Sequence, residues 1–222
     1  MALALIAVSP AIAWSAAYPP NTGAVGIYGA VGSTFDGLAG YQMLTPLTPH
    51  SGYFIAHPGQ VNPSFSSFGD FIGLGSAKGV GVDLCSDYYG SGWQVYADGS
   101  VYGVYFCNEL QYVAGNAQSQ SFIIQRHPGS CPHETGPGWD VLWQRVVLEC
   151  ISESFSWADF VSSGAENGGN YPNQPLKVID VQLQYRVAGH PYVYWSGHSN
   201  VVDPPYTMTK YLNRNDSYTI SP

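Results

Sequence analysis

Trp143, Arg145 and Glu149 are the side chains whose types and spacing suggest a binding chemistry. They fall within the apolar run 141–151, and a single extended strand there would place all three on one face. A flat indole ring beside charged hydrogen-bonding groups is the arrangement that a sugar-binding groove uses. The alternative is a surface Arg–Glu pair with the tryptophan packed between two layers of sheet.

The rest of the sequence contains no motif that indicates a catalytic or metal-binding site. None of the six histidines has an i, i+4 partner of the kind found in zinc proteases, and the sequence contains no G-x-S-x-G elbow for a serine nucleophile. The run 131–134, Cys-Pro-His-Glu, invites a metal interpretation, but a disulfide-anchored polar loop explains it more simply. We therefore predict no catalytic residue, no metal ion and no cofactor.

Four cysteines indicate an oxidising compartment. Cys85, Cys107, Cys131 and Cys150 form no C-x-x-C pair, and their even number fits two disulfides. Three pairings are open, and Cys85–Cys107 with Cys131–Cys150 is favoured because each pair brackets a local hairpin-like segment. The alternative is four buried free thiols in a cytosolic protein.

The composition argues against highly charged partners. Charged residues make up 10% of the 222-residue chain, the formal net charge is −8, and the seven basic residues form no cluster. A nucleic-acid binder needs a basic footprint to neutralise phosphates, and an anionic membrane surface attracts the same groups. We therefore expect neither partner. A low-charge surface rich in tyrosine and glycine suits packed assembly or stacking on sugars.

Short β-rich runs separated by glycine and proline predict an all-β protein. We expect an antiparallel β-sandwich of jelly-roll type that forms a single domain over residues 24–222. The Asp98–Gly99 pair is expected to form a hairpin turn, and residues 154–163 a short helix. The expected strands are 52–56, 70–74, 92–97, 101–107, 120–126, 141–151, 177–187 and 192–196.

A family resemblance rests on three of these segments. Residues 52–56, the Phe-Ile-Gly-Leu-Gly run at 71–75 and the aromatic hairpin that ends at Phe106 resemble the concanavalin-like jelly rolls, and among them the glutamic peptidase-like secreted proteins. The resemblance implies a jelly roll whose catalytic groups are a glutamine and a glutamate. The motif expected around that glutamate is absent from this sequence, so the resemblance assigns neither role to a residue here.

The N-terminal segment 1–17 is apolar and carries no charged side chain. It can be read as a signal peptide, although it lacks the usual basic start, or as an extended arm that inserts as a strand into its own domain or a neighbouring subunit. Residues 18–23, with two prolines and Asn-Thr-Gly, are expected to form a linker.

These observations lead to an extracellular or cell-surface protein with no membrane segment in its mature form. Our main hypothesis is a self-assembling structural subunit, of filament or surface-layer type, whose partner is a second copy of itself. One alternative is a lectin-like module that binds an extracellular glycan, and a second is a secreted acid hydrolase of the glutamic peptidase type. Asn215 begins an Asn-Asp-Ser glycosylation sequon.

Overall fold

The described part of the chain consists almost entirely of antiparallel β-strands. The computed structural model describes residues 22–51, 53–63, 70–80, 85, 92–113, 119–168, 177–196, 199–202 and 206–221. The segment 1–17 and most of the predicted linker lie outside these residues. The strands are β1 Thr22–Met43, β2 Tyr53–Asn62, β3 Phe71–Val80, β4 Trp93–Val101, β5 Val104–Val113, β6 Ser119–Arg126, β7 Gly138–Trp143, β8 Val146–Ser152, β9 Ala158–Gly168, β10 Val178–Val187, β11 Val193–Tyr194, β12 Ser199–Val202, β13 Thr207–Lys210 and β14 Tyr218–Ser221.

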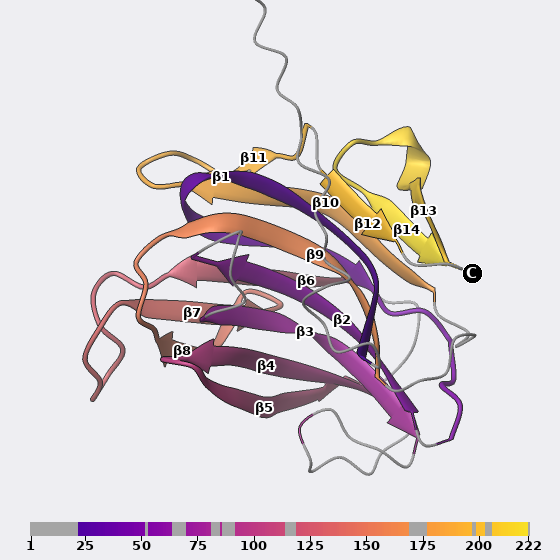
Figure 1. Ribbon diagram of the computed structural model, residues 1–222, viewed down its shortest axis with the longest axis horizontal. Helices are drawn as coiled ribbons and strands as arrows, with labels where there is room; N and C mark the ends of the chain where they lie inside the picture. Colours follow the sequence, from indigo (N-terminus) through magenta and orange to yellow (C-terminus); the bar gives the residue numbers. More distant parts are fainter. Residues whose placement is uncertain are drawn as a thin grey trace, which may run out of the picture.

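The long strand β1 belongs to two layers of sheet (Figure 1). Its first half pairs with β9 and β12, and β9 continues through β2, β3 and β4 to the edge strand β5. Its second half lies between β10 and β6. From there the second layer runs through β14 to β13 on one side and through β7 to the edge strand β8 on the other. The predicted all-β sandwich is therefore confirmed.

Between the layers lies an apolar core. Leu38 and Phe122 from the second layer meet β2 at Gly59, where a Cβ atom would lie 2.5 Å from the Phe122 ring. Glycine at this position lets the layers approach without a clash. Four tryptophans are almost fully buried in the molecule: Trp93, Trp139, Trp143 and Trp195.

A polar network crosses this core. His57 Nε2 on β2 lies 2.7 Å from Asp180 Oδ1 on β10, and the Ser163 hydroxyl of β9 donates to Asp180 Oδ2 at 2.7 Å. Gln42 on β1 donates to the His57 carbonyl at 2.7 Å and accepts from the Ser76 hydroxyl at 3.0 Å. All five side chains are buried. Because serine and histidine both bind the aspartate, the set lacks the serine-to-histidine hydrogen bond of a nucleophile and serves to join the layers.

One predicted turn, one predicted continuous strand and one predicted helix are wrong. Asp98 and Gly99 lie inside β4, and the hairpin turns instead at Tyr102 and Gly103, whose φ angles of 51° and 76° are both positive. The predicted strand 141–151 is interrupted by a turn at Gln144 and Arg145, with φ angles of 50° and 65°.

The segment predicted to be helical forms β9 from Ala158 onward. This strand lies between β1 and β2, where hydrogen bonds from both neighbours outweigh the weak helical spacing of its aromatic residues. In the described residues the one helical element is the 3₁₀ turn Tyr211–Asn213, so no helix there has the length and apolarity to span a bilayer.

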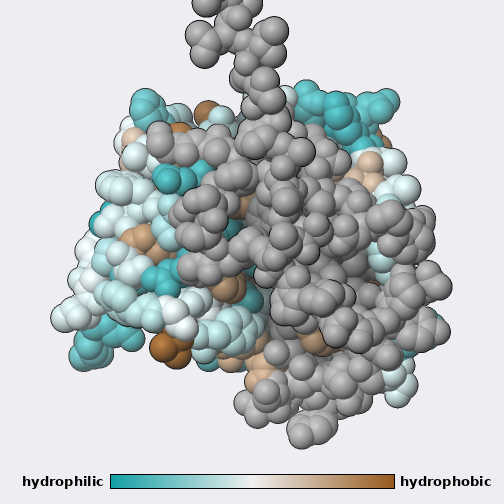
Figure 2. All heavy atoms as spheres, viewed as in Figure 1, coloured by the Kyte–Doolittle hydropathy of each residue, from teal (hydrophilic) through white to brown (hydrophobic). Residues whose placement is uncertain are grey.

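The surface is mostly polar, with scattered apolar side chains. On the face shown in Figure 2 the described residues are mostly pale or teal, and the brown residues are scattered over it. Single exposed apolar side chains are normal for a folded protein.

The inter-layer network generates the first prediction. Asp180→Ala removes the acceptor for both His57 and Ser163 and leaves a buried imidazole without its partner, so the free energy of unfolding should fall by about 3–5 kcal/mol. Urea denaturation followed by tryptophan fluorescence measures this loss. Asp159→Asn, an exposed aspartate on β9, is the matched control and should change stability by less than about 0.5 kcal/mol. An equal, small loss in both variants would contradict the role assigned to the network.

Candidate functional site

The outer face of the first layer carries a row of polar residues, which we call the outer-face row. Strand register places Ser162 opposite Gln60, Gln60 opposite Gly73, and Gly73 opposite Asp98. Asp98 in turn pairs with Cys107 on β5. Cross-strand partners project on the same side of a sheet, so the row runs straight across five strands.

This row is polar yet largely shielded from solvent. Ser162 is 1% exposed, Gln60 6% and Asp98 8%. The inner faces of the same strands carry the apolar core, so the polar side chains occupy the alternate positions. Polar groups held in a partly dry setting interact more strongly with a bound molecule than they would in water.

Within the row, Gly73 has no side chain and so leaves room for the Asp98 carboxylate beside Gln60. The position that a Cβ atom on Gly73 would take is filled by Asp98 Oδ1. Gln60 flanks Gly73 from the neighbouring strand, and the Tyr105 hydroxyl donates to Asp98 Oδ2 at 3.4 Å. A carboxylate can move a proton and an amide can donate to a developing oxyanion, so the pair has the groups that amide hydrolysis needs.

A disulfide anchors the end of the row. Cys107 is bonded to Cys85, and Cys131 to Cys150, which is the pairing favoured from the sequence. Because Cys107 pairs with Asp98, the first disulfide holds Cys85 against the face that carries the row.

A separate cavity of about 540 Å³ lies at the side of the sandwich where the edge strands β5 and β8 meet. We call it the seam cavity. Asn108 on β5 donates to Glu149 Oε1 on β8 at 2.9 Å and so connects the two layers there. The lining residues are Val101, Tyr102, Phe106, Asn108, His133, Glu134, Thr135, Glu149, Cys150, Ile151 and Ser152.

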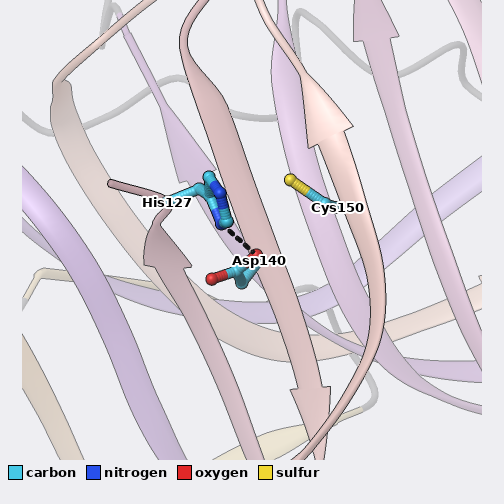
Figure 3. A group of neighbouring side chains, drawn as sticks. All are labelled: His127, Asp140 and Cys150. Carbon is cyan, nitrogen blue, oxygen red and sulfur yellow. Dashed lines mark hydrogen bonds and ion pairs between the residues drawn. The ribbon is translucent and has the colours of Figure 1, made fainter. Parts of the chain in front are cut away.

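His127, Asp140 and Cys150 bring potential metal ligands together (Figure 3). His127 Nδ1 lies 2.9 Å from Asp140 Oδ1, and one ligand atom from each of the three residues lies within 4.8 Å of the others. The Cys150 sulfur, however, is bonded to Cys131 and cannot act as a thiolate. Two remaining ligands are too few for a protein zinc site.

The residues predicted to bind a sugar do not form a groove. Trp143 is 1% exposed, and its indole nitrogen donates to Gln120 at 3.2 Å, so its ring faces the interior. Arg145 is exposed at the β7–β8 turn, while Glu149 lies at the seam cavity. The interpretation failed because it assumed one continuous strand. Asn215 is exposed and accepts a hydrogen bond from Lys210 at 2.6 Å, and its glycosylation stays a prediction.

Sequence reasoning missed the outer-face row. Asp98 is predicted to lie in a turn because Asp-Gly is a strong turn signal, and Gln60 lies outside the predicted strand 52–56. The available signal was the alternation of polar and apolar residues along β4, but it becomes a site only when the strand order is known.

Glu153 is a second carboxyl group with unusual surroundings. It follows β8 and is 1% exposed, and burial raises its pKa to about 8, with a further increase from the Asp70 carboxylate. Ser154 donates its hydroxyl to Asp70, which also accepts from the Gly103 amide at 2.9 Å. These contacts tie the β8–β9 connection to the β4–β5 turn beside the seam cavity.

Comparisons with known proteins place the fold. No protein-family model and no curated protein matches this chain. Scytalidoglutamic peptidase, solved with a peptide-based transition-state analogue, matches with a TM-score of 0.59 and 8% identity over 90% of this chain and 98% of that chain. SCP-B, an eqolisin-family peptidase solved with a tripeptide, matches with a TM-score of 0.58, 8% identity and the same coverage.

The chain has the fold of the glutamic peptidases. A further scytalidoglutamic peptidase structure, with a transition-state analogue inhibitor, gives a TM-score of 0.54 and 10% identity over 90% of this chain and 97% of that chain. The resemblance inferred from the sequence is confirmed at the level of the fold.

This similarity overturns the main functional hypothesis from the sequence. We expected a self-assembling structural subunit because the surface has little charge and the N-terminal segment is apolar. The solved structures that match over nine-tenths of the chain are peptidases, and neither the structural nor the glycan-binding role draws support from them. Low surface charge therefore was a poor guide to function.

Glu153 generates the second prediction. Its folded-state pKa of about 8 lies above the ordinary value of 4.5, so its contribution to stability is full below pH 4.5 and is lost as the pH rises through 8. The urea midpoint of the protein should therefore fall across this interval. Glu153→Gln, which keeps the shape and stays neutral, should reduce the fall. A variant with the same pH dependence as the wild type would show that another group is responsible.

Proposed function

We propose that this protein is a secreted acid hydrolase that cleaves peptide bonds on the outer face of its first layer. The observation that carries the proposal is the outer-face row, where the Asp98 carboxylate and the Gln60 amide flank Gly73. The fold shared with glutamic peptidases supports it, and the two disulfides are compatible with secretion.

The proposed reaction uses these two groups in order. Asp98 accepts a proton from a water molecule, whose oxygen adds to the carbonyl carbon of the peptide bond. Gln60 donates an amide hydrogen to the oxyanion that forms. Asp98 then returns the proton to the leaving nitrogen as the carbon–nitrogen bond breaks. The Tyr105 hydroxyl, which already donates to Asp98 Oδ2, stabilises the ionised carboxylate and holds its position.

This arrangement departs from the pair of residues that the family resemblance implies. The carboxylate here is an aspartate on β4 and the amide is a glutamine on β2, whereas the resemblance implies a glutamine and a glutamate. Aspartate is one methylene shorter, and Gly73 compensates because it leaves room for the carboxylate directly above its strand.

Stability at low pH agrees with an acid-working protein. A neutral Glu153 stabilises the fold on the acid side of its pKa, as derived above. We therefore expect the free energy of unfolding to be high in the acidic pH range in which the proposed reaction runs fastest.

Two substitutions test the proposal directly. Asp98→Asn should reduce the cleavage rate of an acid-denatured mixed protein substrate by at least ~100-fold, since the base is lost. Gln60→Ala should reduce kcat by roughly 10²–10³-fold, since a single oxyanion donor is lost. Rates are measured from about pH 2 to pH 7, with Asp159→Asn as the charge-matched control. The proposal fails if the wild type cleaves nothing in this range or if Asp98→Asn is fully active.

A steric variant tests the geometry separately. Gly73→Ala places a methyl group where the Asp98 carboxylate lies, so the carboxylate must move. We expect kcat to fall by at least ~10-fold, with the two disulfides retained and a cooperative thermal transition. Near-normal kcat in a folded Gly73→Ala protein would mean that the carboxylate position over Gly73 does not matter for the reaction.

A further inference from the structure

The seam cavity is not used by the proposed reaction. Asn108 and Phe106, which line it, alternate along β5 with Cys107, the end of the outer-face row. Successive residues of a strand point to opposite faces, so the cavity and the row lie on opposite sides of the first layer. A molecule in the cavity would therefore not contact the row.

Two acidic side chains line this cavity, Glu149 and Glu134. One histidine, His133, lies in the same lining, and none of the eleven described lining residues is a lysine or an arginine. Glu149 Oε1 accepts from Asn108 at 2.9 Å, but its second oxygen, Oε2, is buried and has no hydrogen-bond partner among the described residues. The Ser152 hydroxyl is also buried, and the described part of the chain offers it no partner. An unpaired buried carboxylate oxygen is costly, and a bound cation would remove that cost.

The remaining lining is apolar. Phe106 and Val101 from the first layer and Ile151 from the second contribute carbon surface beside the acidic groups. Such a mixture suits a ligand with an apolar stem and a positively charged tip. A bare divalent cation fits less well, because calcium needs six to eight oxygen ligands and the cavity offers two carboxylates.

We propose that the seam cavity binds an alkylammonium group, with its carbon chain against Phe106 and Ile151 and its ammonium against Glu149 Oε2. Glu134 adds a second negative charge at the opening, where it is exposed. A lysine side chain of a peptide and a free aliphatic diamine both present this chemistry. The site is additional to the proposed peptidase function and does not depend on it.

Isothermal titration of the whole protein tests the inference near pH 6. The probes are 1,4-diaminobutane, Nα-acetyl-lysine amide and, as the neutral control, 1-butanol. We expect saturable binding of at least one amine with a Kd below ~10 mM. Binding of the diamine alone would identify a free amine as the ligand, and binding of the lysine amide alone would identify a peptide side chain. Butanol should not compete at equal concentration.

Glu149→Gln is the decisive variant. Glutamine keeps the shape and can still accept from Asn108, so the seam should remain closed while the negative charge is lost. Amine affinity should fall at least ~10-fold, whereas Asp159→Asn, which removes the same charge at a distant exposed site, should leave it unchanged. The inference is overturned if neither amine binds, if butanol binds equally well, or if a folded Glu149→Gln protein retains wild-type affinity.

Discussion

The contact between His57 and Asp180 is the interaction on which the two-layer architecture depends. The two side chains come from opposite layers, are almost completely buried, and recruit Ser163 from a third strand. Apolar packing alone would allow the two layers to shift relative to each other, whereas the hydrogen bonds of the network are all formed in one relative position of the layers. The network therefore sets the position of β2 and β9 relative to β10. Since β2 carries Gln60 and β9 carries Ser162, it also sets where the outer-face row can lie.

Both faces of the first layer are thus used for different purposes. The inner positions of β2, β3 and β9 hold the apolar core and the polar network, and the outer positions hold the outer-face row. Because both faces belong to the same strands, a substitution on one face can shift the backbone and so displace the side chains on the opposite face. This arrangement explains why glycine occurs at Gly59 and at Gly73, since the space of a side chain is taken by Phe122 of the second layer at Gly59 and by Asp98 of the adjacent strand at Gly73.

Many of the strands and both disulfide pairs could be predicted from the sequence, but the long strand β1, the strand β9 and the candidate site could not. Alternation and turn residues located most strands, because these signals are local. The turn at Gln144 and Arg145 has no glycine, and Asp98–Gly99 has the composition of a turn but lies inside a strand, so local signals failed at both places. The outer-face row joins β9, β2, β3, β4 and β5, whose order depends on long-range pairing. No single sequence segment contains that information.

The shared strand β1 has a consequence for how the chain comes to be folded. Its hydrogen-bonded partners are β6, β9, β10 and β12, all of which follow it by many residues. During synthesis, β1 is made first among the described strands. It can pair with its partners in the two layers only after most of the chain has been made. Topologies of this kind form slowly. A chain that stays unfolded until its synthesis is complete suits passage through a translocation channel. Its exposed apolar strands would need chaperones during that time.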